Sequence, residues 1–519
     1  SRHCFVFLED MLMFYAARFF VGYDLLEARA FRITRDADLY LDEEDAQDLV
    51  VEVERQLKKR QRGQAVRLEF EVGTSRFMRR FMTQEMNLEK EDMYQIDGPL
   101  DMTVFFGFCG IKGYDHLRYP EAHPHSPWSM LELKRTPETN IFDMIREKDL
   151  LIHLPYESFD ESVVNFLYSA ANDKDVLAIK QTLYRVSSSS PVVQALEKAV
   201  QNGKQVTVLM EVKARFDEAN NILMARRLEK AGAHVIYGLV GLKTHSKCTL
   251  VIRREKDGIR RYVHVATGNY NASTAKLYTD LGILTCSDRF GIDASAFFNL
   301  LSGYSDPPIW DSFIVAPINL RQRCIELIDR EIHFAKNGED AHMIAKMNSL
   351  LDKGIIEKLY EASQAGVKIE LIVRGICVLI PGIPGVSDNI TVRSIVGRFL
   401  EHSRIFWFRN GGREELYISS ADWMPRNLND RVELMVPIED PEIKRRLKQM
   451  VDIELSDNQK AHIMQADGTW LKTISAENQL CAQEYFQKIA EKRDAEDEMT
   501  LAQKLEPYTP VLGHGDGSD

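Results

Sequence analysis

The sequence predicts a mixed α/β (α+β) fold with two tandem α/β domains, related by a pseudo-twofold axis and preceded by a partial α+β head domain. Two observations predict this fold. Between residues 130 and 455, apolar runs of strand length alternate with amphipathic runs of helix length, which is typical of βαβ units. The same order of runs then occurs a second time after roughly 160 residues, which is far longer than a solenoid period and indicates a duplicated domain.

These patterns divide the chain into four segments. We expect the head domain in residues 1–125, the first α/β domain in 126–315, the second in 316–490 and an acidic, disordered tail in 491–519. The head ends in YPEAHPHSPW, whose three prolines in ten residues indicate a linker. The tail carries eight acidic residues against three basic ones, a composition typical of disorder. Because the chain opens within sequence that looks folded, we expect a further N-terminal portion before Ser1.

The first α/β domain alternates runs of strand type with runs of helix type. The runs of strand type are DVLAIKQTLYRV (175–186), KQVTVLMEV (204–212) and HVIYG (234–238), and the helical runs are VVQALEKAVQNG (192–203) and NNILMARRLEKAGA (220–233). Gly203 and Gly232 are expected to end the two helices. The strands are apolar almost throughout, as expected of parallel strands buried on both faces.

The second domain repeats this order. DAHMIAKMNSLLD (340–352) matches the first strand and aligns Lys346 with Lys180, and IIEKLYEASQAGVKIELIVRG (355–375) repeats the helix, the glycine and the next strand.

Composition excludes several classes of protein. A chain of 519 residues is too long for one core. Its most apolar run, LIVRGICVLIPGIPGV, is broken by Arg374 and by prolines, so we expect no transmembrane segment. The net charge of −12 argues against a nucleic-acid partner, although basic residues lining one channel could still hold a polyanion. Seven scattered cysteines without CxxC spacing argue against disulfides and zinc, and fit a reducing cytoplasm.

Two histidines lie in matching surroundings. His245 lies in GLKTHSKCTLVIRRE and His402 in RFLEHSRIFWFRN. A cation follows each histidine at plus two, then a β run, and then a small residue with Asn or Asp, in TGN and SSAD. Two copies of one unit predict a single active centre at the pseudo-twofold interface. There, one neutral histidine could attack phosphorus while the other moves protons.

Other histidines lack this repeated context. His264 lies in the middle of the strand-like run RRYVHVA at an alternating position, which predicts a buried structural histidine. His123 and His125 have no third ligand at a suitable spacing, so we expect no metal site there.

Three arginines are candidates for phosphate binding. Arg185 and Arg215 follow the C-terminal ends of predicted strands, where open α/β sheets bind ligands, and Arg374 lies in the corresponding part of the second half. A guanidinium that ends an apolar strand is costly unless it has a partner, and its planar fork suits phosphate. Tyr278 in KLYTD could stack on a base, but the residues alone favour packing.

Several strings then resemble a known family. YRVS, KARFDEANN, GLKTHSK, TGNYN, KLYTDLGILT, VRGIC, SIVGRFLEHSRI and YISSADWMPRN resemble the two C-terminal catalytic domains of bacterial polyphosphate kinase, the histidine-phosphorylating class. The resemblance covers residues 130–455 and, more weakly, the residues before them. It implies two phospholipase D-like domains, a truncated head and a missing N-terminal helical domain. It also implies a cytoplasmic enzyme that moves the ATP γ-phosphate reversibly to inorganic polyphosphate through a phosphohistidine, with Mg²⁺. We also expect a homo-oligomer.

The resemblance implies a role for each matching residue. It makes His245 the phosphorylated nucleophile, His402 the general acid/base and an ATP contact, Tyr278 and Arg374 further ATP contacts, and Arg185 and Arg215 the positions associated with Mg²⁺ and phosphate. Because a guanidinium has no lone pair for a metal, we expect the last two to hold the oxygens of a metal-bound phosphate.

Two other functions are compatible with parts of the pattern. The duplicated histidine unit also resembles phospholipase D phosphodiesterases, but their Asp five residues after the cation is Ile252 in one half and Arg409 in the other. The second alternative is a polyphosphate-binding protein whose catalytic centre is inactive. The two intact histidines argue against this hypothesis.

Overall fold

The computed structural model describes residues 4–37, 49–60, 63–131, 139–187, 189–303 and 309–504, and only the backbone for 494–504. The chain forms two compact units, Ser1–Glu121 and Ala122–Asp519. This boundary lies within the proline-rich linker, close to the predicted end of the head domain at residue 125.

The first unit is built on a three-stranded sheet. Strands β1 (Phe31–Arg35) and β2 (Ala65–Glu71) are antiparallel, and β3 (Met93–Ile96) runs parallel to β2. The helices include α1 (Leu8–Phe14), α2 (Leu49–Arg60), α3 (Arg76–Met86) and α4 (Phe105–Phe108). A small core that includes Leu68, Phe70 and Met82 joins α3 to the sheet.

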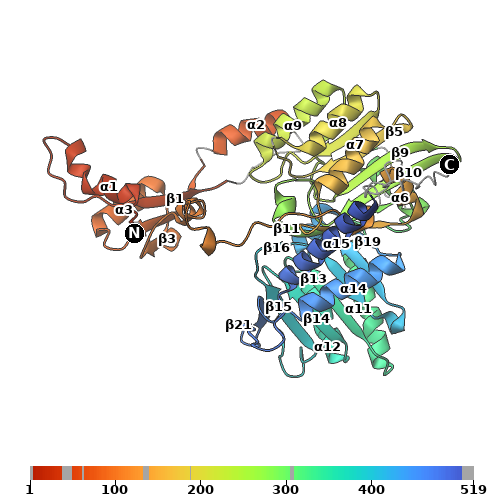
Figure 1. Ribbon diagram of the computed structural model, residues 1–519. Coiled ribbons are helices and arrows are strands. Elements are labelled where there is room, and N and C mark those ends of the chain that lie inside the picture. Colours follow the sequence, from red (N-terminus) through yellow and green to blue (C-terminus); the bar gives the residue numbers. More distant parts are fainter. Residues whose placement is uncertain are drawn as a thin grey trace, which may run out of the picture. The chain divides into compact units, whose positions relative to one another are not determined.

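The second unit contains two large mixed sheets (Figure 1). The first sheet has the order β16-β11-β10-β9-β5-β6-β7, and β4 pairs with β11. Its strands are β4 (Leu150–Leu154), β5 (Val176–Leu183), β6 (Gln205–Met210), β7 (His234–Tyr237), β9 (Cys248–Glu255), β10 (Gly258–Ala266), β11 (Tyr278–Thr285) and β16 (Leu400–Glu401). Strands β5, β6 and β7 are parallel and coincide with the three predicted strands.

Helices α6 (Ile141–Glu147), α7 (Asn165–Asn172), α8 (Pro191–Gln201), α9 (Glu218–Ala231) and α10 (Asp288–Leu301) accompany this sheet. Helix α8 begins with Pro191 at its first turn, and the Ser190 hydroxyl accepts the N–H of Val193 at 3.4 Å. Helix α9 ends at Gly232, which adopts the left-handed conformation (φ 106°) that glycine tolerates best. Local sequence therefore sets the ends of the helices that were predicted.

The second sheet has the order β12-β19-β18-β17-β13-β14-β15-β20-β21, and β8 pairs with β19. Its strands are β8 (Lys243–Thr244), β12 (Ile314–Ala316), β13 (His342–Met347), β14 (Lys368–Val373), β15 (Ile390–Ile395), β17 (Ile405–Phe408), β18 (Glu415–Ser419), β19 (Arg431–Pro437), β20 (Ala461–Met464) and β21 (Trp470–Lys472). The helices are α11 (Leu320–Lys336), α12 (Lys353–Gln364), α13 (Pro425–Asn429), α14 (Pro441–Leu455) and α15 (Ala482–Lys504).

The two sheets repeat one topology. The path β7-β6-β5-β9-β10-β11 of the first sheet corresponds strand by strand to β15-β14-β13-β17-β18-β19 of the second. The predicted duplication of a mixed α/β domain is thus confirmed. One detail of the predicted alignment is wrong. Lys180 lies opposite Leu250, which is five residues after His245. Lys346 lies opposite Ile405, which is only three residues after His402. The internal alignment was off by two residues because both strands are apolar on either side of the lysine.

The two halves exchange short strands. Strand β16 belongs to the second half but pairs in parallel with β11 of the first, with Tyr278 opposite Leu400. Strand β8 belongs to the first half but pairs in parallel with β19 of the second, with Arg431 opposite Lys243. Each exchanged strand lies directly before one of the two repeated histidines. The pseudo-twofold exchange therefore carries each histidine to the sheet of the other half.

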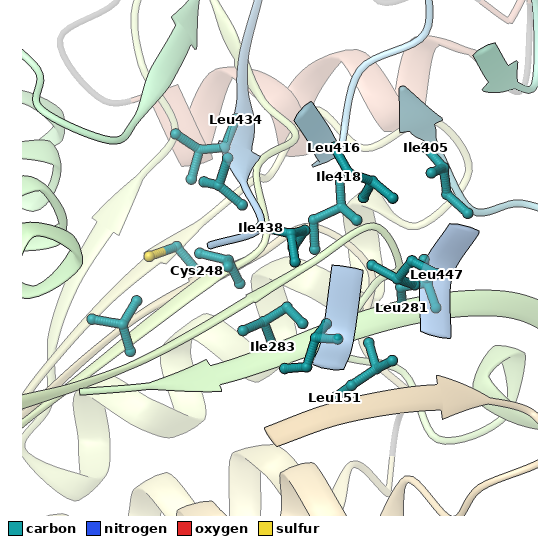
Figure 2. Close-up of a cluster of buried hydrophobic side chains, with 14 of the residues drawn as sticks. Leu151, Cys248, Leu281, Ile283, Ile405, Leu416, Ile418, Leu434, Ile438 and Leu447 are labelled. Atoms are coloured by element: carbon teal, nitrogen blue, oxygen red, sulfur yellow. The ribbon is translucent and has the colours of Figure 1, made fainter. Parts of the chain in front are cut away.

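One apolar core joins the two sheets. Figure 2 shows side chains of both halves packed together, with Cys248, Leu281 and Ile283 from the first sheet facing Ile418 and Leu434 from the second. All five are at most 4% exposed. Burial of apolar side chains from both halves makes the junction part of the folded interior, so the site at this junction has a rigid support.

Helix α15 runs through much of the predicted tail. It continues to Lys504, so the predicted disordered segment 491–519 is helical up to that residue, and 505–519 lie outside the described residues. Alanine, glutamate and lysine dominate this helix and are strong helix formers, which explains the difference. Within the described ranges, none of the helices is both long and apolar enough to cross a bilayer.

Candidate active site

The exchanged strands seat the two histidines. His245 follows β8, and its N–H donates to the carbonyl of Val432 on β19 at 3.0 Å. His402 follows β16, and its N–H donates to the hydroxyl of Thr279 on β11 at 3.2 Å. The two residues are 7% and 8% exposed. The backbone of each histidine is thus fixed by a contact to the opposite half of the unit.

A carboxylate from the opposite half holds the imidazole of His245. Its Nδ1 lies 2.8 and 2.9 Å from the two carboxylate oxygens of Glu433 on β19. The Ser420 hydroxyl also donates to Glu433, and the ring of Tyr184 packs edge-on against the imidazole at 4.7 Å. Because Glu433 accepts the proton on Nδ1, the lone pair of His245 lies on Nε2, the nitrogen that can act as a nucleophile.

His402 is held in the reciprocal way. Its Nδ1 lies 2.8 and 2.9 Å from the oxygens of Asp280 on β11. The Thr267 hydroxyl donates to the same carboxylate at 2.6 Å. Asp280 is the third residue of β11 and Glu433 is the third residue of β19, so the two carboxylates occupy corresponding positions. Each half therefore supplies one histidine and the carboxylate that orients the other half's histidine.

The cations at plus two differ in their surroundings. The Lys247 ammonium donates to the carbonyl of His245, and the Arg404 Nη1 donates to the carbonyl of His402 at 2.7 Å. Arg404 also forms a fork with Asp422, at 3.1 Å from Nε and 3.2 Å from Nη2. The residue in the place of Asp422 in the first half is Asn269, which carries no charge. Arg404 therefore has a carboxylate partner at a position where the first half offers Lys247 an uncharged amide.

Burial and these cations keep both histidines neutral. Burial lowers the pKa of His245 well below its usual value, and Lys247, Arg431 and nearby Arg404 lower this pKa further. Burial also lowers the pKa of His402, although Asp280 opposes this effect. Each imidazole is therefore deprotonated near pH 7, as a nucleophile or a general base requires.

The two supporting carboxylates differ. Burial raises the pKa of Glu433 to about 7, and Lys247 and Arg431 only partly oppose this. Burial alone would raise the pKa of Asp280 as well, but His402, the Thr267 hydroxyl and Arg404 outweigh it and lower this pKa. Burial lowers the pKa of Lys247 to about 7. The environment of His245 can therefore change its charge near neutral pH, whereas Asp280 stays ionised beside His402.

Two of the predicted ATP contacts lie beside His402. The ring centre of Tyr278 is 5.2 Å from that of His402. The Arg374 Nε donates to the amide oxygen of Asn348, whose nitrogen donates to the His402 carbonyl at 3.1 Å. Burial, followed by repulsion from Arg404, lowers the pKa of Arg374. Tyr278 and Arg374 thus both lie close to His402.

The other predicted pair lies on the side of His245. The Nε of Arg185 is 2.8 Å from a carboxylate oxygen of Asp217, and its Nη2 donates to the Arg215 carbonyl at 3.2 Å. The Arg185 guanidinium lies 5.6 Å from the ring centre of Tyr184, the ring that packs on His245. Arg185 is therefore one aromatic ring away from His245, and it is linked to Arg215 through a backbone carbonyl.

Sequence reasoning missed the acidic part of the site. The residues predicted from the sequence do not include Asp280, Glu433 or Asn348. A usable signal existed, because Asp280 in YTDLGILT and Glu433 in RVELMVP interrupt apolar strands. A carboxylate in such a run is costly unless it has a partner, the same argument that singled out Arg374.

The described side chains do not form a cage for a metal. No group of three or more histidine, cysteine or acidic side chains in the described ranges is arranged to hold an ion. Arg185 and Arg215, the predicted metal positions, offer hydrogen-bond donors only. Mg²⁺ is usually bound by one or two carboxylates together with substrate phosphates, so the residues here fit the phosphate better than the ion.

Three family models match the chain along its length. They are the polyphosphate kinase middle domain at residues 1–108, the polyphosphate kinase C-terminal domain 1 at 140–307 and the polyphosphate kinase C-terminal domain 2 at 313–483.

Curated relatives and a solved structure agree with these models. A polyphosphate kinase of Halalkalibacterium halodurans is 52% identical over 464 residues, which cover 89% of this chain and 65% of that protein. One of Bacillus anthracis is 49% identical, covering 92% of this chain and 67% of that protein. The crystal structure of polyphosphate kinase from Porphyromonas gingivalis matches with a TM-score of 0.81 at 32% identity, covering 94% of this chain and 71% of the other. The chain thus spans about two thirds of the length of the curated relatives it matches.

Proposed function

Because the chain belongs to the polyphosphate kinase family, we propose that the protein containing it transfers the γ-phosphate of ATP reversibly to inorganic polyphosphate. One observation supports this most strongly. Two neutral histidines are each oriented through Nδ1 by a carboxylate of the opposite half. That arrangement leaves Nε2 of His245 available for attack among fixed cations, which is the chemistry that phosphoryl transfer requires.

In the first step, the Nε2 lone pair of His245 attacks the γ-phosphorus of ATP. The N–P bond forms, the bond from this phosphorus to the bridging oxygen breaks, and ADP leaves with that electron pair. Glu433 accepts a hydrogen bond from Nδ1–H, which keeps its proton, and so stabilises the positive charge that develops on the ring. The orientation of His245 by Glu433 therefore serves both geometry and charge.

In the second step, a terminal oxygen of the polyphosphate chain attacks the phosphorus on His245. The new P–O bond forms, the N–P bond breaks and its electron pair returns to Nε2. His402 is the general acid/base of the proposal, because it is neutral and can take a proton from a protonated acceptor phosphate. In the reverse direction it returns that proton.

The cations stabilise the transferring group. Lys247 and Arg404 lie beside the two histidines, and their charge offsets the negative charge on the equatorial oxygens. Tyr278 and Arg374 are proposed to contact ATP together with His402. Arg185 and Arg215 are proposed to hold phosphate oxygens. We include Mg²⁺ as a companion of the nucleotide phosphates, and its chemistry would be charge neutralisation on those oxygens.

A labelling experiment tests the proposal. Full-length protein is incubated with ATP labelled at the γ-phosphate, and the label is mapped by peptide mass spectrometry. We expect an acid-labile, base-stable label on His245 and synthesis of polymer. His245→Ala should abolish both.

His264→Gln is the matched control. His264 is also buried, at 2% exposed, but its Nδ1 contacts the Tyr270 hydroxyl at 2.9 Å and it lies in neither copy of the repeated histidine motif. The His264→Gln variant should be labelled at His245 like the parent protein. Label retained in His245→Ala, together with polymer synthesis, would exclude the proposed nucleophile. Cleavage of a phosphodiester substrate without polymer synthesis would favour the phosphodiesterase function instead.

The remaining expectations stay proposals of the same kind. We propose a cytoplasmic protein, since all seven cysteines are free thiols in the structure. The net charge of −12 argues against a nucleic-acid partner. We propose ATP, ADP and inorganic polyphosphate as partners, held by the basic residues of the site. The homo-oligomer is a prediction that sedimentation of the full-length protein can check.

A further inference from the structure

A buried lysine lies between two buried carboxylates behind His402. The Lys346 ammonium on β13 is 2.6 Å from Glu401, and it also donates to Glu454 on α14. The three side chains are 2–3% exposed. The carboxylates together raise the pKa of Lys346 despite its burial, and burial raises the pKa of Glu454 to about 7. An ion cluster this deep is costly to desolvate, so its presence calls for a role.

Glu401 is the centre of the cluster. Its Oε2 accepts the Thr279 hydroxyl at 2.9 Å in addition to Lys346. Its Oε1 accepts the side-chain amide of Gln483 on α15 at 2.6 Å. Gln483 also donates to the carbonyl of Phe399 at 2.9 Å and accepts its N–H at 2.9 Å. Four elements, β11, β13, α14 and α15, therefore converge on the exchanged strand β16.

This cluster reaches His402 by two short routes. Glu401 is the residue immediately before His402. The Thr279 oxygen that donates its proton to Glu401 accepts the N–H of His402 at 3.2 Å. Thr279 in turn precedes Asp280, whose carboxylate holds the imidazole of His402 at 2.8 Å. The carboxylate of Glu401 thus connects the strand that carries His402 with the strand that carries its orienting group.

The first half has a different buried group behind His245: Glu211, 0% exposed, accepts the N–H of Thr244 at 2.7 Å, and the charge of Lys213 acts on this carboxylate. Thr244 precedes His245 where Glu401 precedes His402, and Val432 precedes Glu433 where Thr279 precedes Asp280. The two halves therefore support their histidines with different buried groups. The cluster of Glu401, Lys346 and Glu454 is the one that lies behind the histidine that is proposed to move protons.

We propose that Glu401, with Lys346, Gln483 and Thr279, is a positioning device that fixes the backbone and imidazole of His402 for proton transfer. The inference deepens the proposed function and rests on it. These residues do not touch substrate. They act through His402 and Asp280, so their loss should lower the turnover number more than substrate affinity.

The test uses the full-length protein with Glu401→Gln and Gln483→Leu. Glu401→Gln keeps the shape of the side chain but removes its charge, and Lys346 retains Glu454 as a partner. Gln483→Leu removes the neutral amide on α15 that donates to Glu401 and pairs with the backbone of Phe399. We expect kcat for polymer synthesis to fall about 10- to 100-fold, the range typical of small misplacements of a reacting group, with KM for ATP changed less than about threefold.

Asp293→Asn is the matched control. Asp293 is a buried carboxylate on α10, 2% exposed, that accepts the N–H groups of residues 311–313 and contacts neither histidine. The Asp293→Asn variant should have a lower melting temperature but an unchanged kcat.

Thr279→Val supplies a second measurement. When it is combined with Glu401→Gln, the two effects on kcat should be far from multiplicative, because both residues act through one chain of contacts.

The inference is overturned if Glu401→Gln and Gln483→Leu retain parental kcat, or if their kcat falls only in proportion to the fraction of protein that is folded. Multiplicative effects of Thr279→Val and Glu401→Gln would also overturn it. Failure of the proposed function looks different, because the parent protein would then make neither labelled histidine nor polymer.

Discussion

Glu433 lies 2.8 Å from Nδ1 of His245, although the two residues come from different halves of the duplicated unit. The exchanged strand β8 brings them together by pairing with β19. The reciprocal pair, Asp280 and His402, depends in the same way on β16 and β11. Neither half therefore contains a complete histidine–carboxylate pair of its own, and the site exists only when both halves are folded against each other.

Glu433→Gln should therefore impair formation of the phosphohistidine. The amide keeps the shape of the side chain but cannot stabilise a positive imidazole, and it can impose the wrong tautomer on His245. We expect the rate of label incorporation to fall by at least about 100-fold, measured by rapid quenching with γ-labelled ATP. Asp280→Asn, its counterpart beside His402, should slow turnover while leaving His245 able to accept label. Equal and complete loss of labelling in both variants would contradict this division of roles.

The pH dependence of labelling should shift with Lys247. Burial, followed by Lys247, lowers the pKa of His245 well below its usual value, so the imidazole stays neutral on the acid side of pH 6.5. Lys247→Met removes one cation and should raise this pKa, moving the acid limb of the labelling rate to higher pH. Quenched-flow rates from pH 5 to 8 provide the measurement.

Lys276→Met, at an exposed position, is the control for removing a positive charge. It should leave the acid limb where it is in the parent protein. If the midpoint of the acid limb in Lys247→Met coincides with that of the parent, Lys247 does not set the pKa of His245.

Much of the fold could be predicted from sequence because its signals are local. Strands β5, β6 and β7 are apolar runs, and Gly232 ends α9 in a left-handed conformation that only glycine adopts easily. Even the duplication was visible, because both halves keep the same order of runs. The two-residue error between Lys180 and Lys346 arose since apolar strands offer no internal landmark for register.

The site was predicted only in part, because its pairing is non-local. His245 and His402 were singled out from repeated surroundings, and the structure places each beside a carboxylate of the opposite half and a cation of its own. Their carboxylate partners lie more than 100 residues away along the chain, and the exchange of β8 and β16 follows from no local pattern. Helix α15 was missed for a different reason: acidic composition suggested disorder, although its alanine, glutamate and lysine residues favour a helix.

His264 should make the second unit sensitive to acid. Burial lowers its pKa to about 3, whereas the unfolded chain binds a proton near pH 6.5. The unfolded state therefore gains protons first as the pH falls, and stability that is present above pH 6.5 is lost between 6.5 and 3. From pH 7 to 5 this one residue should cost about 2 kcal/mol. Urea unfolding of His264→Gln at both pH values should show a correspondingly smaller loss than the parent; an equal loss would argue that His264 is protonated in the folded state.

The junction core should be essential for stability. Leu281 on β11 is 1% exposed and packs between the two sheets, next to Asp280 along the strand (Figure 2). Leu281→Ala should lower the free energy of unfolding by about 2–5 kcal/mol, the usual cost of a cavity at a buried leucine. Leu223→Ala, on α9 and 59% exposed, makes the same chemical change at the surface and should cost less than about 1 kcal/mol. Urea denaturation of both variants gives the comparison. Similar losses would mean that the halves are not held together by this core, whereas a selective loss in Leu281→Ala, accompanied by slower phosphohistidine formation, would tie the packing of the junction to the reciprocal histidine–carboxylate pairs.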